Sequence, residues 1–129
     1  MIKSGILNPT ILSLLSRVRH TNTLVIADRG FPLWPTIETI DISLVDGVPQ
    51  VLEVLRAIRE QAHFGKAWMA EEFLSSNSQP VVDSFASALE GVSLIHETHE
   101  EFKKRIPQSI GLIRTGDTIQ YANIILESA

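Results

Sequence analysis

Four residues spread along the chain combine acid–base and hydrogen-bonding side chains: His20, Asp28, His99 and Asn123. A histidine titrates near neutral pH and can move protons in both directions. An aspartate can orient such a histidine or hydrogen-bond a polyol, and a second histidine with an amide adds donors and acceptors. This set suits a small, uncharged, hydroxyl-rich substrate and needs neither a nucleophile nor a cofactor.

Each histidine also has a plainer role that the sequence allows. His20 follows a predicted helix, where a cation suits the helix C-terminus. His99 follows a threonine that can cap a helix, which would place it in an exposed first turn, and His96 competes with it for any functional role. Two histidines and an aspartate can also bind iron or zinc. The candidates lie on separate segments without a histidine pair at i, i+4 spacing, so we expect no metal ion and keep a metal-dependent enzyme as an alternative.

The composition excludes several classes of protein. The chain has 129 residues, 44% hydrophobic and 20% charged, which is typical of one folded domain spanning residues 1–129. Its formal charge of −4 and sequence pI near 5.5 give no basic surface for nucleic acid or for an anionic membrane. Without cysteine there is no disulfide, thiolate metal site or thiol nucleophile. The phosphate-binding pattern G-x-G-x-x-G and the serine-hydrolase pattern G-x-S-x-G are both absent, so we expect no nucleotide cofactor.

Membrane and export signals are also absent from the sequence. No apolar run approaches the ~20 residues that span a bilayer. The N-terminus turns polar again by Asn8 and lacks the pattern of a signal peptide. We therefore expect a soluble, cytoplasmic protein without a membrane partner.

The apolar pattern alternates between strand and helix along the chain. Short apolar or alternating runs predict strands at 23–27, 37–43, 65–70, 92–95, 110–114 and 123–126. Apolar stripes at helical spacing predict helices that begin at Asn8, after residue 49, near residue 81 and at Thr98, with a polar loop at 75–80. This order predicts an α/β fold, a single three-layer domain with a largely parallel sheet flanked by helices and a C-terminal antiparallel hairpin. In such sheets ligands bind at the carboxyl ends of the strands, where Asp28, Glu71, Glu72, His99 and 114–117 are expected.

Short motifs along the whole chain, in a fixed order, are similar to those of one known family: Lys3–Asn8, His20-Thr21, Ile26–Asp28, Phe31-Pro32, Ile40-Asp41, Gly47–Pro49, Val54-Leu55, Ala70–Glu72, His99–Lys103, Ile113–Asp117 and Tyr121–Leu126. Each motif alone is weak, but the ordered combination is specific. The chain thus resembles the D-ribose pyranase / L-fucose mutarotase family, and within it the ribose pyranase branch.

The resemblance implies an isomerase of carbohydrate metabolism that interconverts the ring and anomeric forms of a free monosaccharide without a cofactor. D-ribose, as in ribose catabolism, is the first expected substrate. An L-fucose-type mutarotase is the alternative, and so is a non-catalytic sugar-binding or transport-associated protein. The resemblance also implies a homodecamer of two stacked pentameric rings with the site at a subunit boundary. By position, the general acid is His20, and the sugar-binding residues are Asp28, His99, Tyr121, Ala122 and Asn123, the last three from a neighbouring subunit.

The implied reaction sets a task for each of these side chains. Opening a hemiacetal needs a proton delivered to the ring oxygen and another removed from the anomeric hydroxyl. We expect His20 to protonate the ring oxygen and Asp28 to orient it or to hold a sugar hydroxyl. His99 or a bound water is then expected to take the anomeric proton.

Three positions depart from the family's pattern. Asn22 stands where ribose-type members carry an aspartate. Arg29 lies directly beside Asp28, where we expect it to pair with that carboxylate and lower its pKa or to reach toward a charged substrate. Trp34 is expected either to stack on a sugar face or, together with Phe31, to cover a subunit interface.

Overall fold

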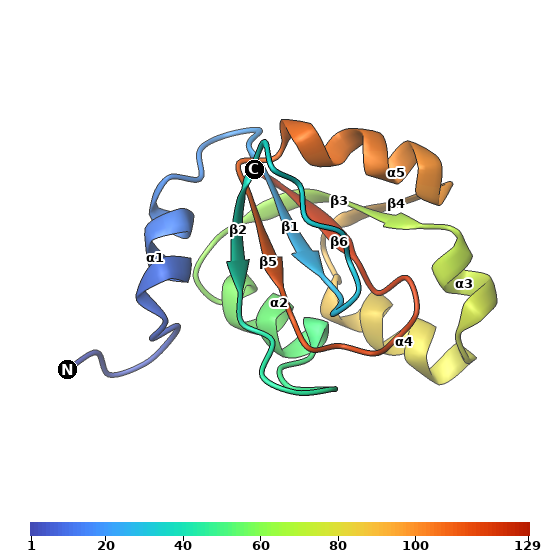
Figure 1. Ribbon diagram of the computed structural model, residues 1–129, viewed down its shortest axis with the longest axis horizontal. Helices are drawn as coiled ribbons and strands as arrows, with labels where there is room; N and C mark the ends of the chain where they lie inside the picture. The colour runs from blue at the N-terminus through green and yellow to red at the C-terminus, as the bar shows by residue number, and fades with distance from the viewer.

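A six-stranded sheet in the order β2-β5-β1-β6-β3-β4 forms the centre of the computed structural model, which describes residues 1–129 (Figure 1). The strands are β1 (Thr23–Ala27), β2 (Glu38–Asp41), β3 (Phe64–Ala70), β4 (Ser93–Glu97), β5 (Gly111–Arg114) and β6 (Ile124–Ser128). Five of them run in one direction, and β6 is antiparallel to both of its neighbours, β1 and β3. The expected α/β class with a largely parallel, helix-flanked sheet is confirmed.

The expected hairpin between the last two strands is wrong, because β1 lies between β5 and β6. After β5, the backbone N–H and the hydroxyl of Thr115 both donate to the carbonyl of Ala27, at 2.9 Å and 2.8 Å. These bonds carry the chain across the end of β1 instead of folding it back beside β5. The final strand therefore enters the sheet one position further on, between β1 and β3.

Helices cover both faces of the sheet, and alternate residues of the central strands point to the two layers. Leu24 and Ile26 belong to the larger apolar cluster, which includes residues of α1 (Pro9–Ser16), α2 (Val51–Arg59), α3 (Glu72–Ser76) and α4 (Gln79–Ala88). Val25 and Ala27 belong to the smaller cluster, beneath α5 (His99–Arg105) and the short 3-10 helix η1 (Ile106–Gln108). The expected polar loop at 75–80 instead holds the end of α3 and the start of α4. Burial on both faces explains the unbroken apolar run of β1.

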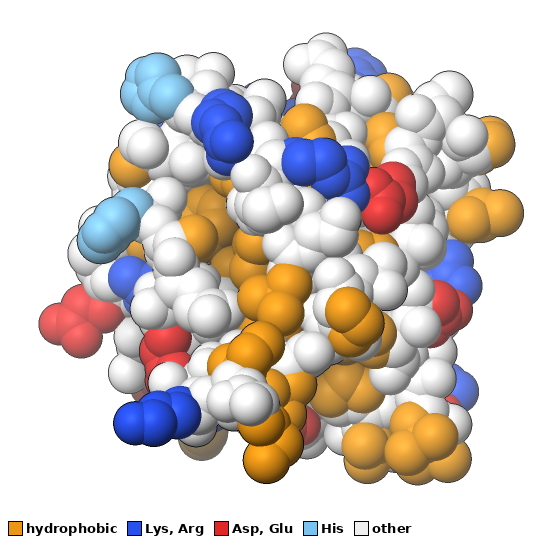
Figure 2. All heavy atoms as spheres, turned by 90° about the vertical axis from the view of Figure 1, so that its left-hand side faces the viewer, with side chains coloured by type: hydrophobic (Ala, Val, Ile, Leu, Met, Phe, Trp, Pro, Cys, Tyr) orange, Lys and Arg blue, Asp and Glu red, His pale blue; other side chains and the backbone are white.

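The face formed by the N-terminal segment, α1 and α2 carries a band of hydrophobic side chains (Figure 2). An apolar groove of about 260 Å³ runs through it. Its hydrophobic lining consists of Ile6, Leu7, Ile11, Ile42, Val54, Ala57 and Ile58. Further apolar side chains are exposed in the loop after β2, at Leu44, Val45 and Val48. None of the helices has both the length and the apolar character needed to cross a bilayer.

Candidate functional site

The antiparallel direction of β6 brings two distant parts of the sequence together at one edge of the sheet. Asp28 follows the carboxyl end of β1, and Asn123 precedes the amino end of β6. Because Ile26 of β1 is paired with Ile124 of β6, these two residues lie side by side. The backbone N–H of Asp28 donates to Oδ1 of Asn123 at 2.8 Å. The carboxyl ends of the five parallel strands meet at this same edge, where α/β proteins bind their ligands.

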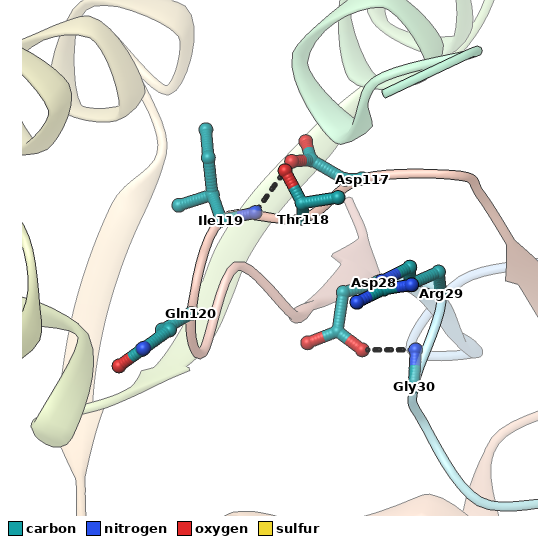
Figure 3. Close-up of a pocket in the computed structure, with 7 residues that line it drawn as sticks. All are labelled: Asp28, Arg29, Gly30, Asp117, Thr118, Ile119 and Gln120. Carbon is teal, nitrogen blue, oxygen red and sulfur yellow. Dashed lines mark hydrogen bonds between the residues drawn. The ribbon is translucent and has the colours of Figure 1, made fainter. Parts of the chain in front are cut away.

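A cavity of about 370 Å³ opens at this edge. Its lining consists of Asp28, Gly30, Phe31, Pro32, His99, Gln120, Tyr121 and Asn123. A second cavity of about 310 Å³ adjoins it and shares Asp28, Gly30 and Gln120 (Figure 3). Both volumes suit a small ligand, since ligand sites usually measure ~300–1,000 Å³.

Four of the six predicted site residues line this cavity: Asp28, His99, Tyr121 and Asn123. The fifth, Ala122, is fully buried in the larger apolar cluster and does not line the cavity. The expectation that residues 121–123 reach the pocket from a neighbouring subunit is wrong, because one chain already brings them beside Asp28 and His99. Gly30, Phe31, Pro32 and Gln120 were not predicted as site residues, although Phe31 and Pro32 belong to the turn that leaves the first strand.

His20 lies at the other edge of the sheet. It belongs to the turn between α1 and β1, and β1 separates this turn from Asp28 (Figure 1). The rise of a strand over residues 23–28 is roughly 16 Å, so His20 does not reach the cavity of its own chain. The His20 side chain is exposed, and the next residue, Thr21, has a left-handed φ of 67°. A non-glycine residue in this conformation is uncommon and often marks a functional turn.

Asn22 holds the His20 turn in place. Its Oδ1 accepts the backbone N–H of Arg19 at 2.8 Å, while the backbone N–H of Thr21 donates to the carbonyl of Ser128 at 3.0 Å. An aspartate, the residue that the resemblance leads us to expect here, would offer the same acceptor oxygen. The departure at Asn22 therefore keeps the hydrogen bond and removes a negative charge two residues from His20.

Asp28 is held as an acceptor in a partly desolvated position. Burial raises the pKa of Asp28 above its ordinary value, the amide of Gly30 and the side chain of Asn123 lower it by smaller amounts, and the charge of Asp117 raises it. The expectation that Arg29 pairs with Asp28 and lowers its pKa is wrong. Arg29 instead forms an exposed ion pair with Asp46 at 2.9 Å, so no cation is paired with Asp28.

We expect Asp28→Asn to stabilise the protein at pH 7. A carboxyl group whose pKa is raised by folding favours the protonated native state, so its ionised form lowers the free energy of unfolding. That cost appears as pH rises through the unfolded and then the folded pKa of Asp28, and it vanishes below both. Urea denaturation of both proteins at fixed chain concentration should show Asp28→Asn more stable at pH 7, with the difference shrinking toward pH 3. A variant less stable than the wild type at pH 7 would contradict this account of Asp28.

His99 is fixed at the first residue of α5 by contacts on both sides. Its backbone N–H donates to both carboxylate oxygens of Glu72, each at 3.1 Å. Its ring lies parallel to Phe102 with centroids 6.0 Å apart and meets the edge of Tyr121 at 5.2 Å. The expected helix start is confirmed, because the hydroxyl of Thr98 accepts the backbone N–H of Glu101 at 3.3 Å.

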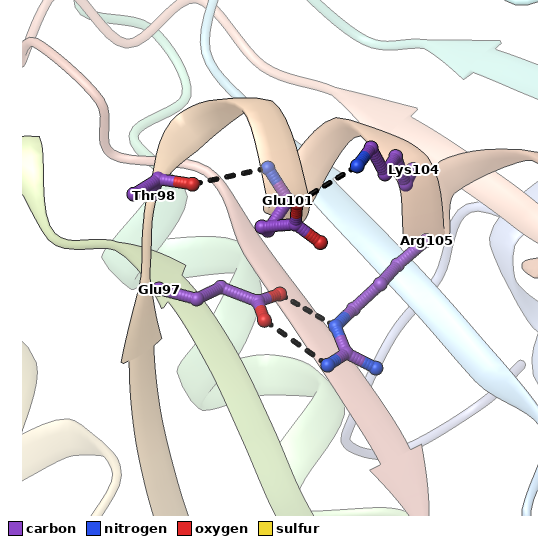
Figure 4. Close-up of polar contacts among 5 residues, drawn as sticks. All are labelled: Glu97, Thr98, Glu101, Lys104 and Arg105. Carbon is purple, nitrogen blue, oxygen red and sulfur yellow. Dashed lines mark hydrogen bonds and ion pairs between the residues drawn. The ribbon is translucent and has the colours of Figure 1, made fainter.

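The C-terminal end of α5 is also tied to β4 (Figure 4). The Glu97 carboxylate at the end of β4 accepts two bonds from the Arg105 guanidinium, at 2.5 Å and 3.0 Å. The guanidinium in turn lies 4.5 Å from the centroid of the Trp68 ring. This bidentate pair fixes the helix that carries His99 against the sheet.

The loop that carries Tyr121 is held by Asn77, from the connection between α3 and α4. Tyr121 has a left-handed φ of 56°. The side-chain Nδ2 of Asn77, between α3 and α4, donates to the carbonyls of Phe73 and Gln120, both at 2.9 Å. Asn77 therefore ties the helical layer to the loop just before Tyr121. Sequence reasoning assigned nothing to Asn77, whose stretch it predicted as a loop.

The remaining candidates lie away from the cavity. Trp34 does not line it and packs against the smaller apolar cluster, whereas Phe31 lines the cavity and meets the ring of Phe102 edge-on at 6.4 Å. His96 lies half-buried on the edge strand β4, where burial lowers its pKa, so His99 is the histidine of this site. No three histidine, aspartate or glutamate side chains gather in a group able to hold a metal ion.

Known proteins share this fold and this sequence pattern. The sequence model of the RbsD / FucU transport protein family matches residues 1–129. The D-ribose pyranase of Geobacillus kaustophilus (strain HTA426) is 41% identical over 128 residues, which cover 99% of this chain and 93% of the relative. The D-ribose pyranase of Bacillus cytotoxicus is 36% identical and is covered to 97%.

Two solved structures give the same picture. Bacillus subtilis RbsD complexed with D-ribose superposes with a TM-score of 0.93 at 32% identity, covering 100% of this chain and 98% of that one. The fucose mutarotase of Streptococcus pneumoniae in complex with L-fucose has a TM-score of 0.80 at 22% identity, covering 95% and 92%, which is a likeness of fold.

Proposed function

Because the chain belongs to the RbsD / FucU transport protein family, we propose that it is a cofactor-free isomerase that interconverts the pyranose and furanose forms of D-ribose. The observation that carries the proposal is the cavity at the sheet edge. It presents a carboxylate, an imidazole, a phenol and an amide from Asp28, His99, Tyr121 and Asn123. These groups are hydrogen-bond partners for the hydroxyls of a free sugar. Relatives named D-ribose pyranase, and a neighbour solved with D-ribose, support ribose as the substrate.

The conversion needs acid–base chemistry alone. The hemiacetal opens, a C–C bond rotates, and the chain closes again from a different hydroxyl. A positioned acid or base typically accelerates such a step by ~10²–10⁴-fold. In our proposal His20 is the acid, and the cavity residues bind the sugar.

We propose further that His20 acts in the cavity of a neighbouring copy of the chain. Three observations support this arrangement. The turn that carries His20 lies one strand length from the cavity of its own chain. It is exposed, and its backbone is held rigidly by Asn22. The groove beside α1 and α2 and the exposed Leu44, Val45 and Val48 form apolar surface of the kind that subunit contacts cover. A closed ring would repeat this head-to-tail contact at every subunit, and the decamer of two stacked pentamers stays our expected assembly.

Saturation-transfer NMR on equilibrated D-ribose, with and without the protein, tests the proposed activity. We expect faster exchange between the pyranose and furanose signals. Faster exchange between only the α and β pyranose signals, or with L-fucose alone, would replace the proposal with a mutarotase activity. Binding of either sugar without any faster exchange would identify a sugar-binding protein and contradict an enzyme. The cytoplasmic location expected from the sequence stays a prediction.

A further inference from the structure

The structure distinguishes the two groups that could take the anomeric proton, and the inference drawn from this rests on the proposed function. His99 lines the cavity, but its Nδ1 is buried and has no hydrogen-bond partner. Glu72, the carboxylate that contacts this residue, uses both oxygens for the backbone N–H of His99 rather than for its ring. Nε2 bonds to no group of the chain and is not among the buried atoms without a partner, so Nε2 is the ring nitrogen left to contact a ligand.

This arrangement selects one tautomer of the neutral His99 ring. A buried N–H without an acceptor is among the rarest features of folded proteins, and a buried lone pair is tolerated better. We therefore assign the proton to Nε2 and the lone pair to the buried Nδ1, from the hydrogen-bond partners. With its proton on Nε2, the ring donates a hydrogen bond into the cavity and has no accessible lone pair with which to accept a proton.

Asp28 offers what His99 lacks. One carboxylate oxygen, Oδ1, accepts the backbone N–H of Gly30 at 3.0 Å. The other is turned into the open space between Asp28 and Gln120 (Figure 3). Arg29 is engaged with Asp46, so this second oxygen has no cation against it. The titratable side chains around the carboxylate are Asp117 in the adjoining cavity and His99 and Tyr121 across the main one.

From this geometry we propose that Asp28 is the general base of ring opening and that His99 is a fixed N–H donor. The oxygen of Asp28 that faces the cavity takes the proton of the anomeric hydroxyl. The electron pair of that O–H bond forms the C1=O bond, and the bond between C1 and the ring oxygen breaks. The ring oxygen keeps the electrons of the broken bond and takes a proton from His20. The Nε2–H of His99 donates to an oxygen of the sugar throughout.

Closure uses the same two groups in exchanged roles. After opening, Asp28 carries a proton and His20 has lost one. As a different hydroxyl attacks C1, His20 takes the proton of that hydroxyl and Asp28 returns its proton to the carbonyl oxygen. Both groups regain their starting states, so one turnover needs no other reactant.

The test compares Asp28→Asn with His99→Gln. Asparagine keeps an acceptor for the Gly30 amide, and glutamine keeps a donor near the position of Nε2. Neither side-chain amide can act as a base. We expect Asp28→Asn to lower the exchange rate at saturating D-ribose by ~10²–10⁴-fold, with the ribose Kd from calorimetry changed by less than about tenfold. We expect His99→Gln to stay within about tenfold of the wild-type rate. The control Asp83→Asn, the same change on the exposed surface of α4, should match the wild type.

The pH profile separates a base from a binding group. The wild-type rate should rise with pH as Asp28 ionises, which gives the pH profile a rising limb. Because burial raises the pKa of Asp28, this limb should lie at a higher pH than the one at which an ordinary aspartate ionises. Asp28→Asn should lack the limb, and His99→Gln should keep it. If Asp28→Asn retains the limb, or if His99→Gln loses both the limb and as much rate as Asp28→Asn, the assignment is overturned.

A second measurement does not depend on activity. Long-range ¹H–¹⁵N NMR of the ligand-free wild-type protein should show the neutral His99 ring protonated on Nε2, and the spectrum of His99→Gln identifies the His99 signals by their loss. A ring protonated on Nδ1 would contradict the inference even in an active enzyme. Conversely, a wild-type protein that accelerates no sugar exchange would contradict the proposed function while leaving the tautomer assignment standing.

Discussion

Two inactive variants, His20→Gln and Asp28→Asn, are expected to regain activity when their chains are mixed in one oligomer. Each variant alone should lose ~10²–10⁴-fold in exchange rate, because one lacks the acid and the other lacks the carboxylate of the cavity. If His20 of one chain serves the cavity of the next, some mixed contacts combine an intact His20 with an intact Asp28. In a random equal mixture, half of the chains carry an intact His20 and the other half an intact Asp28. Because the two chains at each head-to-tail contact are drawn independently, about a quarter of the sites should combine both residues. Saturation-transfer NMR on D-ribose after co-expression of the two chains measures this recovery.

A matched mixture shows whether the recovery reflects a shared site. Wild-type chains mixed equally with the double variant His20→Gln/Asp28→Asn should again give about a quarter of the wild-type rate if the site is shared between chains. If His20 acted in its own chain, this mixture would give about half, and the two single variants would not complement each other. Absence of complementation in oligomers proved to be mixed would contradict the shared site.

The separation of His20 from Asp28 also marks where sequence reasoning was sufficient. Asp28 and His99 each follow an apolar run, and the rule that ligands bind at the carboxyl ends of parallel strands places both at one edge. The structure brings these two residues to one cavity as that rule predicts. The same rule puts His20, which precedes β1, at the opposite edge. The sequence therefore contained the reason why one chain cannot unite all of the predicted residues.

The place of Tyr121 and Asn123 was not predictable in the same way. Their position depends on β6 entering the sheet between β1 and β3, and such pairing joins strands far apart in the sequence. The glycine-containing stretch directly after β5 is typical of a hairpin turn, but the bonds of Thr115 to Ala27 and of Gly116 to Pro49 direct the chain elsewhere. The assignment of these residues to a neighbouring subunit came from the family resemblance, and the pairing of β6 with β1 replaces it with a place beside Asp28 of the same chain.

Local charge pairing was also misjudged, because the sequence does not show which distant groups meet. Arg29 was expected beside its neighbour Asp28, yet its partner is Asp46, on the loop after β2. The consequence is chemical. An arginine paired with Asp28 would have held the carboxylate ionised, whereas the pairing of Arg29 with Asp46 leaves the carboxylate in the cavity without a cation.

Asp117 lies in the wall of the adjoining cavity, and its replacement by alanine is expected to cost stability. The residue is only 2% exposed. Its Oδ2 accepts the backbone N–H of Val51 at the start of α2, at 2.8 Å, and its Oδ1 accepts that of Ile119 at 2.9 Å. Its carbonyl also accepts the N–H of Arg29 at 3.1 Å. The carboxylate thus joins α2 to the loop that leads to Tyr121, and the carbonyl joins that loop to the residue after Asp28.

Asp117→Ala leaves one buried and one partly buried N–H group without their charged acceptor, so we expect the free energy of unfolding to fall by about 3–5 kcal/mol. Urea denaturation at fixed chain concentration measures the change. Thr118→Ala is the matched control, because Thr118 lines the same cavity but is exposed, and it should stay within about 0.5 kcal/mol of the wild type. If Asp117→Ala proved as stable as Thr118→Ala while losing sugar exchange, Asp117 would belong to the chemistry of the site. The expected result instead makes Asp117 the residue that ties α2 and the loop leading to Tyr121 to the residue after Asp28.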